Sequence, residues 1–192
     1  MRTAFKEWAI VVDALGRGEQ ILILRKGGIH EGKGGFQVEH RRFWLFPTLF
    51  HQQRESVISS AQARFDELPL PDATSVRIEF LAEVVGAYSI DSLETARALR
   101  GQHIWRDEVI KQRYDWGRNK GVYALVTRVY RRRDAVELPM LAEYSGCKSW
   151  IELANDIEEE GLSPVLADAE FAKRIRKVEA SLQQEGTAMV KA

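Results

Sequence analysis

The first half of the chain contains several distinct apolar patterns. Apolar residues spaced by three and four predict a helix over 4–15 that ends at the glycines following it. Apolar runs predict buried strands at 20–24, where only Gln20 is polar, and at 43–46, the second closed by the proline after it. The stretch 32–35 contains too many glycines for regular structure, whereas 52–65 is polar but compatible with a helix.

The second half of the chain changes from helical spacing to alternation. Apolar and polar residues alternate from Val76, which predicts a half-buried strand. Ser89 or Asp91 is expected to cap a helix that runs to about residue 100. The strongest strand pattern covers 122–130, and 135–138 is expected to pair in the same sheet.

A final helix is predicted behind these strands. Ser163–Pro164 is typical of a helix start, since a cap is followed by proline at the first helical position. An apolar stripe then continues to about residue 184. We therefore divide the chain into a domain at 1–153 and an acidic linker with a C-terminal helix at 154–192. Strands separated by one long helical insertion favour an α+β class, a small mixed β-barrel with flanking helices.

Composition narrows the class of protein. The chain has 192 residues, 45% of them apolar, which is enough for a core and too many for intrinsic disorder. Its apolar stretches are far shorter than the roughly 20 residues of a membrane span. No charged leader followed by an apolar run opens the sequence, and the lone Cys147 fits a reducing compartment. We expect a cytoplasmic protein with no membrane partner and no cofactor; the oligomeric state stays open.

The net charge of zero conceals unequal segments. Segment 106–133 has nine basic and three acidic residues, whereas 134–170 has one basic and ten acidic residues. Segments 25–42 and 171–192 each have five basic and two acidic residues. The total excludes a uniformly basic protein, but the segments are compatible with a local positive face for an anionic ligand. Solvated loops and helix faces are the alternative interpretation.

The segment 25–52 holds most of the candidate chemistry. Basic residues, glycines that let backbone N–H groups approach a ligand, and aromatic rings together suit a phosphate with a stacked base. Tight turns and aromatic core residues are the alternative. The candidate ligand-binding residues of this segment are Arg25, Lys26, Gly27, Gly28, Glu31, His40, Arg41, Arg42, Trp44 and His51.

A second basic and aromatic cluster lies around Trp116. Tyr114, Arg118 and Lys120 surround it, and the strand over 122–130 follows directly, with three arginines at its end. One strand flanked by such residues is compatible with a nucleic-acid face, and solvated strand ends are again the alternative. Trp44 or Trp116 would stack on a base, while the basic residues of 25–42 would engage phosphates.

Several other chemistries lack support in the sequence. No GxxxxGK[ST] or GxGxxG motif is present, so a phosphate-binding loop or dinucleotide site is not predicted. Glu31, His40 and His51 have no spacing typical of metal ligands. Cys147 fits a packed turn better than a nucleophile. The letters of a nuclease D/E-x-K motif occur only at Glu31–Lys33, in a glycine loop.

Three stretches resemble an uncharacterised bacterial family. These are KEWAIVVDALGRGEQILILRKGGIHE, FWLFPTLFHQ and YSGCKSW, and together they resemble domain-of-unknown-function family 1802 over about residues 4–153. Some members of that family are joined to a restriction-endonuclease-like domain of the Mrr type. The resemblance therefore implies a context of DNA defence or restriction–modification.

The order of elements also resembles the ASCH branch of the PUA-like barrels. There, a glycine turn leads into a strand with the pattern G-x-K-T-x-E-x-R, and here GEQILILR occupies that place. Arg25 keeps the final arginine, but Glu19, Gln20 and Ile21 stand around the lysine and threonine positions. Members that hydrolyse acetylated cytidine use those two residues, and isoleucine has no hydroxyl. The resemblance thus implies a non-catalytic pocket for RNA or a modified DNA base.

Three hypotheses follow from the sequence. The first is a nucleic-acid-binding domain that reads a modified or flipped base in RNA or DNA, with no catalytic residues. The second is a metal-dependent nuclease or other hydrolase using Glu31, His40 or His51. The third is a protein-interaction module whose C-terminal helix docks through Val165, Phe171, Ile175 and Val178, unless that helix packs on its own barrel.

Overall fold

A computed structural model describes most of the chain and shows one curled mixed sheet. The described residues are 1–26, 31–32, 35–36, 38–49, 51–68, 74–117, 119–146, 148–183 and 187–190. Six strands lie in the order β2-β7-β6-β5-β1-β8, while β9 pairs with β7 and β10 pairs with β6. The strands of this sheet are β1 (Thr3–Trp8), β2 (Leu22–Arg25), β5 (Arg42–Thr48), β6 (Ser75–Ile90), β7 (Val122–Pro139), β8 (Trp150–Glu152), β9 (Leu162–Pro164) and β10 (Thr187–Met189).

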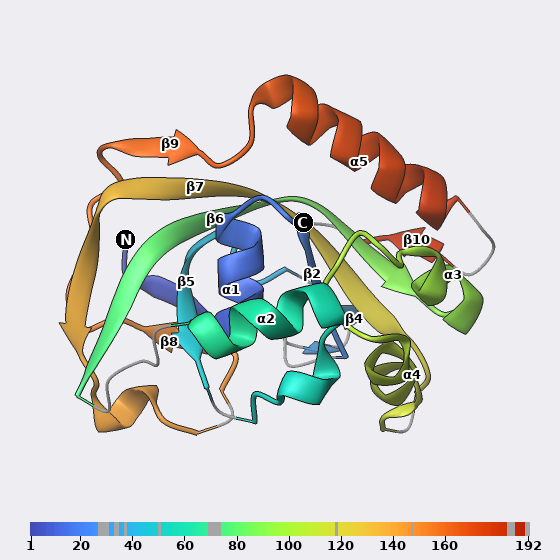
Figure 1. The fold of residues 1–192 in the computed structure, drawn as a ribbon, viewed down its shortest axis with the longest axis horizontal. Coiled ribbons are helices and arrows are strands. Elements are labelled where there is room, and N and C mark those ends of the chain that lie inside the picture. The colour runs from blue at the N-terminus through green and yellow to red at the C-terminus, as the bar shows by residue number, and fades with distance from the viewer. Residues whose placement is uncertain are drawn as a thin grey trace.

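Helices flank this sheet, which confirms the predicted α+β class. The helices are α1 (Ala9–Gly16), α2 (Ser59–Glu67), α3 (Leu93–Ala98), α4 (Asp107–Asp115) and α5 (Asp168–Leu182), with short 3-10 turns η1 (Arg54–Ser56) and η2 (Ala142–Tyr144). Figure 1 shows α1 beneath the arch of β6 and β7 and α5 above it. No helix among the described residues is long and apolar enough to cross a membrane.

The two longest strands give the sheet its curl. β6 and β7 pair antiparallel over almost their whole length, with register shifts between Ile78 and Phe80 and between Val84 and Gly86. Such irregularities bend a strand and increase its twist, so two long strands can wrap around a core. The predicted strands at 122–130 and 135–138 are therefore one continuous strand.

The predicted helix over 4–15 is wrong in its first half. Residues 3–8 form β1, which pairs parallel with β5 and antiparallel with β8. Ala4 and Phe5 are fully buried on opposite faces of this strand, so the apolar spacing that resembled a helix reflects burial on both sides. The helix begins only at Ala9, and Gly18, with a φ of 67°, follows its end as expected.

Proline and glycine positions account for the other differences. Pro47 lies inside β5, where it pairs with Glu7 of β1, and does not close the strand. Ser163–Pro164 belongs to β9, paired with β7, so α5 starts later, at Asp168. Residues 31–32 and 35–36 pair as the short strands β3 (Glu31–Gly32) and β4 (Gly35–Phe36) despite their glycines.

Local hydrogen bonding and packing explain the remaining helices. Ser92 caps α3, with its Oγ accepting from the Thr95 N–H at 3.3 Å, whereas Ser89 belongs to β6 and Asp91 precedes the cap. Phe171 and Val178 of α5 are buried in the main hydrophobic cluster with residues of α1, β2 and β7. The apolar stripe of α5 therefore packs on the domain itself and is not a free docking face. The boundary at residue 153 stays a prediction.

Candidate nucleic-acid interface

An open hollow of about 410 Å³ lies where the end of β1 meets η1 and α4. We call it the Trp116 hollow, after the exposed ring at its rim. Three of the residues predicted from the sequence, Lys26, His51 and Trp116, come together here. Among the described residues, the lining consists of Trp8, Lys26, His51, Gln53, Ser56, Val109, Gln112, Arg113 and Trp116.

Trp116 presents an unusually bare aromatic surface. It follows the last residue of α4, and its side chain is 74% exposed, whereas the other four tryptophans are buried or half-buried. Gly117 follows with a φ of 79°, a left-handed conformation that a side chain would strain. The chain therefore turns sharply behind the ring, which stands at the rim of the hollow with a face available to a ligand.

Lys26 fixes the segment that carries Trp116. Its Nζ donates to the carbonyl oxygens of Tyr114 at 3.0 Å and Gly121 at 2.9 Å, and to that of Asn119. An ammonium group has three protons, so these contacts use all of its donors. Lys26 thus joins the end of β2 to both sides of the 115–120 turn, and its charge stays at the hollow.

Arg113 forms the inner wall of the hollow. Its guanidinium lies 3.8 Å from the centroid of the Trp105 ring, and its Nη1 donates to the Leu24 carbonyl at 2.8 Å. Burial lowers the pKa of Arg113 to about 10, an effect opposed by the carboxylate of Glu7. A pKa of about 10 leaves the guanidinium charged at neutral pH, so it contributes a fixed positive charge beneath the hollow.

Arg25 lies behind this wall and is committed to buried contacts. Its guanidinium donates to Ser149 Oγ at 2.6 Å and to Glu7 Oε2 at 3.4 Å, and it sits 4.7 Å from the centroid of the Phe5 ring. Glu7 is itself buried and accepts from the Trp8 N–H at 2.8 Å. Arg25 therefore ties Ser149 to the sheet and is not among the residues that line the hollow.

His51 and Gln53 come from a bend laid across the start of α1. His51 has a φ of 59°, a left-handed conformation that non-glycine residues rarely adopt. Gln52, between them, accepts a hydrogen bond from the Ile10 N–H at 3.0 Å through its Oε1, which satisfies one free donor of the first turn of α1. The bend is thus anchored to the helix, and its flanking side chains face the hollow.

The remaining predicted residues lie elsewhere. The His40 ring packs 4.9 Å from that of Trp150, and Arg41 is exposed. Arg42 pairs with Glu83 at 3.3 Å and Glu159 at 2.9 Å. Among the residues that the structure describes, no three His, Cys, Asp or Glu gather as a metal site.

Trp44 and the glycine loop complete the set of predicted residues. Trp44 is fully buried, and its Nε1 donates to the Met1 carbonyl at 3.1 Å, so no base can stack on it in the folded chain. Gly27 and Gly28 lie outside the described residues, and of Glu31 only the backbone is described. Two residues of the hollow were not selected from the sequence. Trp8 lies inside the predicted helix over 4–15, and nothing in the sequence around Arg113 indicates that its guanidinium stacks on Trp105.

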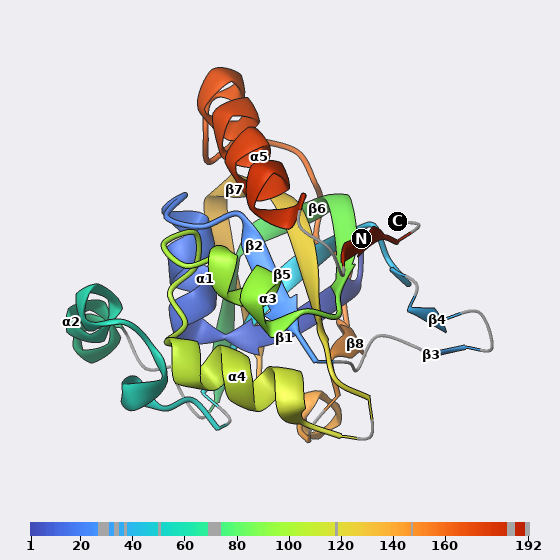
Figure 2. The same cartoon turned by 90° about the vertical axis from the view of Figure 1, so that its right-hand side faces the viewer.

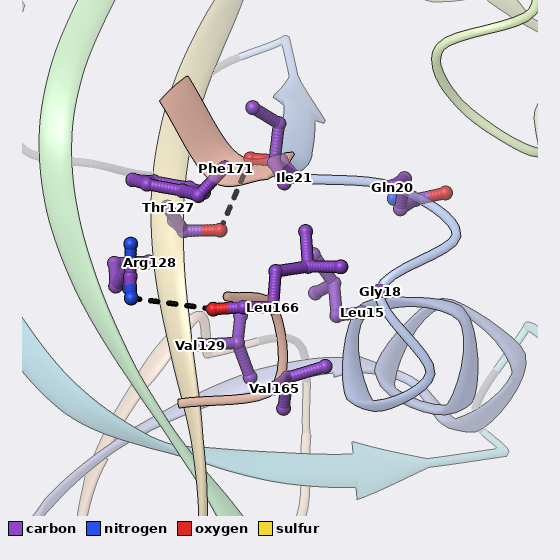
Figure 3. A pocket seen from close by; sticks show the side chains of 10 residues that line it. All are labelled: Leu15, Gly18, Gln20, Ile21, Thr127, Arg128, Val129, Val165, Leu166 and Phe171. Carbon is purple, nitrogen blue, oxygen red and sulfur yellow. Dashed lines mark hydrogen bonds between the residues drawn. The ribbon is translucent and has the colours of Figure 1, made fainter. Parts of the chain in front are cut away.

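The position of the ASCH strand motif forms a separate, closed site. Figure 3 shows Gln20 and Ile21 beside a cavity of about 10 Å³, which has room for about one water molecule. Gln20 is buried, with its Nε2 donating to the Leu22 carbonyl at 2.7 Å and its Oε1 accepting from the Ile104 N–H at 3.1 Å. Both residues therefore serve packing, and this cavity has no space for a nucleotide.

The curled sheet and its hollow define a small mixed α+β domain, and sequence comparison assigns its family. The family described as a domain of unknown function (DUF1802) matches residues 4–177. The chain belongs to this family, as its motifs indicated, and the match extends beyond the expected 4–153 into α5. No curated protein matches the chain.

Two solved structures also resemble the chain. An ASCH protein from Zymomonas mobilis has a TM-score of 0.43 and 12% identity, over 91% of this chain and 92% of that chain. A point variant of the same protein has a TM-score of 0.42 and 13% identity, over 91% and 94% of the two chains. The ASCH likeness expected from the order of elements is thus found, and at these values it carries no residue roles to this chain.

Proposed function

We propose that this protein binds nucleic acid and that one unpaired base, flipped from a duplex or present in a single strand, stacks on Trp116 at the hollow. The observation that supports this most strongly is the 74% exposed indole beside a hollow that is also lined by Lys26 and Arg113. Exposed tryptophans stack on bases in proteins that bind single strands, and a base inside a duplex has no free face for such a contact. The volume of the Trp116 hollow, about 410 Å³, is in the usual range for small-ligand pockets.

The other lining groups suit the edge and backbone of a nucleotide. Gln53 and Gln112 carry amides that can both donate and accept hydrogen bonds, as reading a base edge requires. Lys26 and Arg113 are engaged with backbone carbonyls, but their charges remain and attract phosphates over a distance of about 10 Å at moderate salt. A modified base is a natural candidate, since added groups change the pattern of donors and acceptors at that edge.

Fluorescence titration tests this function. Labelled single-stranded DNA, single-stranded RNA and duplexes, each with and without modified bases, are titrated at low salt against wild type and Trp116→Ala. Met189→Ala is the matched control because Met189 is equally exposed, at 76%, and lies on β10. Stacking contributes about 1–3 kcal/mol per base, so Trp116→Ala should weaken binding about 5- to 150-fold while Met189→Ala has no effect.

The outcome separates the parts of the proposal. Quenching of tryptophan emission on binding is expected, because Trp116 is the exposed indole. Absence of binding by wild type to every probe would refute the function. Equal affinities of wild type and Trp116→Ala would place the ligand away from the Trp116 hollow.

A further inference from the structure

The outer face of α5 carries basic side chains that the fold does not use. Lys173, Arg176 and Lys177 are exposed on the side opposite the buried Phe171 and Val178. No acidic group of the described residues lies within 4 Å of Arg176 or Lys177, and Lys173 makes only a 3.8 Å contact with Glu170 in the same helix. These three cations are therefore available to an external partner.

The same helix is attached to the side of the molecule that holds the Trp116 hollow. Residues 173, 177 and 181 are four apart and form one row along α5. Ser181 at the end of this row accepts a hydrogen bond at 2.9 Å through its Oγ from Gln102, in the connection between α3 and α4. Figure 2 shows α5, α3 and α4 one above another on this side. Arg97 on α3 is a further exposed cation in between.

We infer that Lys173, Arg176 and Lys177, which we call the basic row of α5, bind the phosphate backbone of the nucleic acid whose base occupies the Trp116 hollow. This inference rests on the proposed function. Helices with their side chains are about 10 Å across, so three neighbouring helices span about 30 Å. At about 3.4 Å per nucleotide, the spacing along one strand of a stacked duplex, that corresponds to about nine nucleotides. The strand leaves the hollow at the end of α4 and crosses α3 to reach α5.

A membrane surface is the competing partner for a basic amphipathic helix. Interfacial helices insert an apolar face between lipids. The apolar face of α5 is instead occupied, because Phe171, Val178 and Leu182 are packed in the core. Its free face has charged side chains and no large apolar ones, which suits a phosphate backbone rather than insertion into lipid.

Salt dependence of binding tests the role of α5. The variant Lys173→Gln/Arg176→Gln/Lys177→Gln removes the row with residues that are compatible with a helix. The control variant Arg77→Gln/Arg133→Gln/Lys148→Gln removes the same charge from exposed residues outside the helices. Each is titrated with a labelled single strand of about 16 nucleotides between about 50 and 200 mM salt. Circular dichroism checks that both variants are folded.

The expected result is a change in slope. Each phosphate contact to a single strand contributes about 0.7 to the slope of log K against log salt, so losing three contacts should reduce its magnitude by about 2. The control should keep the wild-type slope. An unchanged slope in the α5 variant overturns the inference. So does a result in which the basic row is needed for binding to anionic phosphatidylserine vesicles but does not affect the slope for the oligonucleotide.

The same titrations separate this inference from the proposed function. If Trp116→Ala weakens binding and the α5 variant keeps its slope, only the role of α5 fails. If the α5 variant changes its slope and Trp116→Ala binds as wild type does, only the hollow fails. If wild type binds no probe, both fail.

Discussion

His103 should make the stability of this protein depend on pH. It lies in the connection between α3 and α4 and is 4% exposed. Its Nδ1 accepts a hydrogen bond from the Trp105 N–H at 3.1 Å, so the neutral ring carries its proton on Nε2. That Nε2 is buried and has no hydrogen-bond partner among the described residues. Protonation would therefore add a buried charge with no acceptor for it.

The size of the effect follows from the two states of the ring. Burial, and next the positive charge of Arg113, lower the pKa of His103 from 6.5 to about 4. At pH values between these two, the unfolded chain binds a proton that the folded chain does not. The free energy of unfolding must then fall as the pH falls from about 6.5 to about 4. A difference of about 2.5 between the pKa values corresponds to a loss of about 3 kcal/mol.

Urea unfolding of wild type and His103→Asn at several pH values between about 7 and 4 measures this loss. The asparagine Oδ1 can still accept from the Trp105 N–H, but the side chain does not titrate. Carboxylates titrate in both proteins and cancel in the difference. Relative to wild type, the variant should gain about 3 kcal/mol on going from pH 7 to pH 4. A difference that does not change with pH would refute the buried, neutral state of His103.

Two further predictions concern the segment that carries Trp116 and the close packing at Gly18. Lys26→Met removes three hydrogen bonds, to the carbonyls of Tyr114, Asn119 and Gly121, and should lower the free energy of unfolding by about 2 kcal/mol. The emission anisotropy of Trp116, obtained by difference from Trp116→Phe, should fall in this variant. An unchanged anisotropy would show that Lys26 does not hold the ring. Gly18→Ala places a Cβ 2.6 Å from Leu166 at a φ of 67°, whereas Gly101→Ala meets open space at a φ of 75°. Backbone strain should lower the free energy of unfolding of both variants by about 1–2 kcal/mol. The loss should be larger, and the melting temperature lower, for Gly18→Ala. Equal losses in the two variants would contradict the close packing at Leu166.

The main strands of the sheet were predictable because the local pattern of apolar residues indicates which of their side chains are buried. Residues 21–24 and 43–46 are apolar on both faces, and the alternation from Val76 matches a half-buried strand. β1 was not predictable in this way. Its partners, β5 and β8, are far away in sequence, and apolar spacing cannot distinguish a short helix from a strand that is buried on both sides.

The candidate site was predictable by residue type and not by position. Lys26 and Trp116 were selected because basic and aromatic residues suit a nucleotide, and the fold brings them to one hollow. Trp44 was selected by the same reasoning and is buried in the core. Residue type alone does not distinguish an aromatic residue in a buried strand from one in an exposed turn. What distinguishes them is the sheet, which buries the first and leaves the second at a rim.

The net charge of a sequence segment also differs from the charge that stays unpaired on the folded surface. This difference identifies the cations that can bind an external anion. The basic strand β7 and the acidic segment after it fold onto each other, so Arg128 pairs with Asp168, while Arg131 pairs with Glu79 at 3.3 Å. The excess of basic residues in 106–133 is therefore partly neutralised on folding. On α5 the row of Lys173, Arg176 and Lys177 has no such partner from another element in the part of the chain that the structure describes. A polyanion responds to the charges left free after folding, so α5 is where phosphate contacts should affect affinity most.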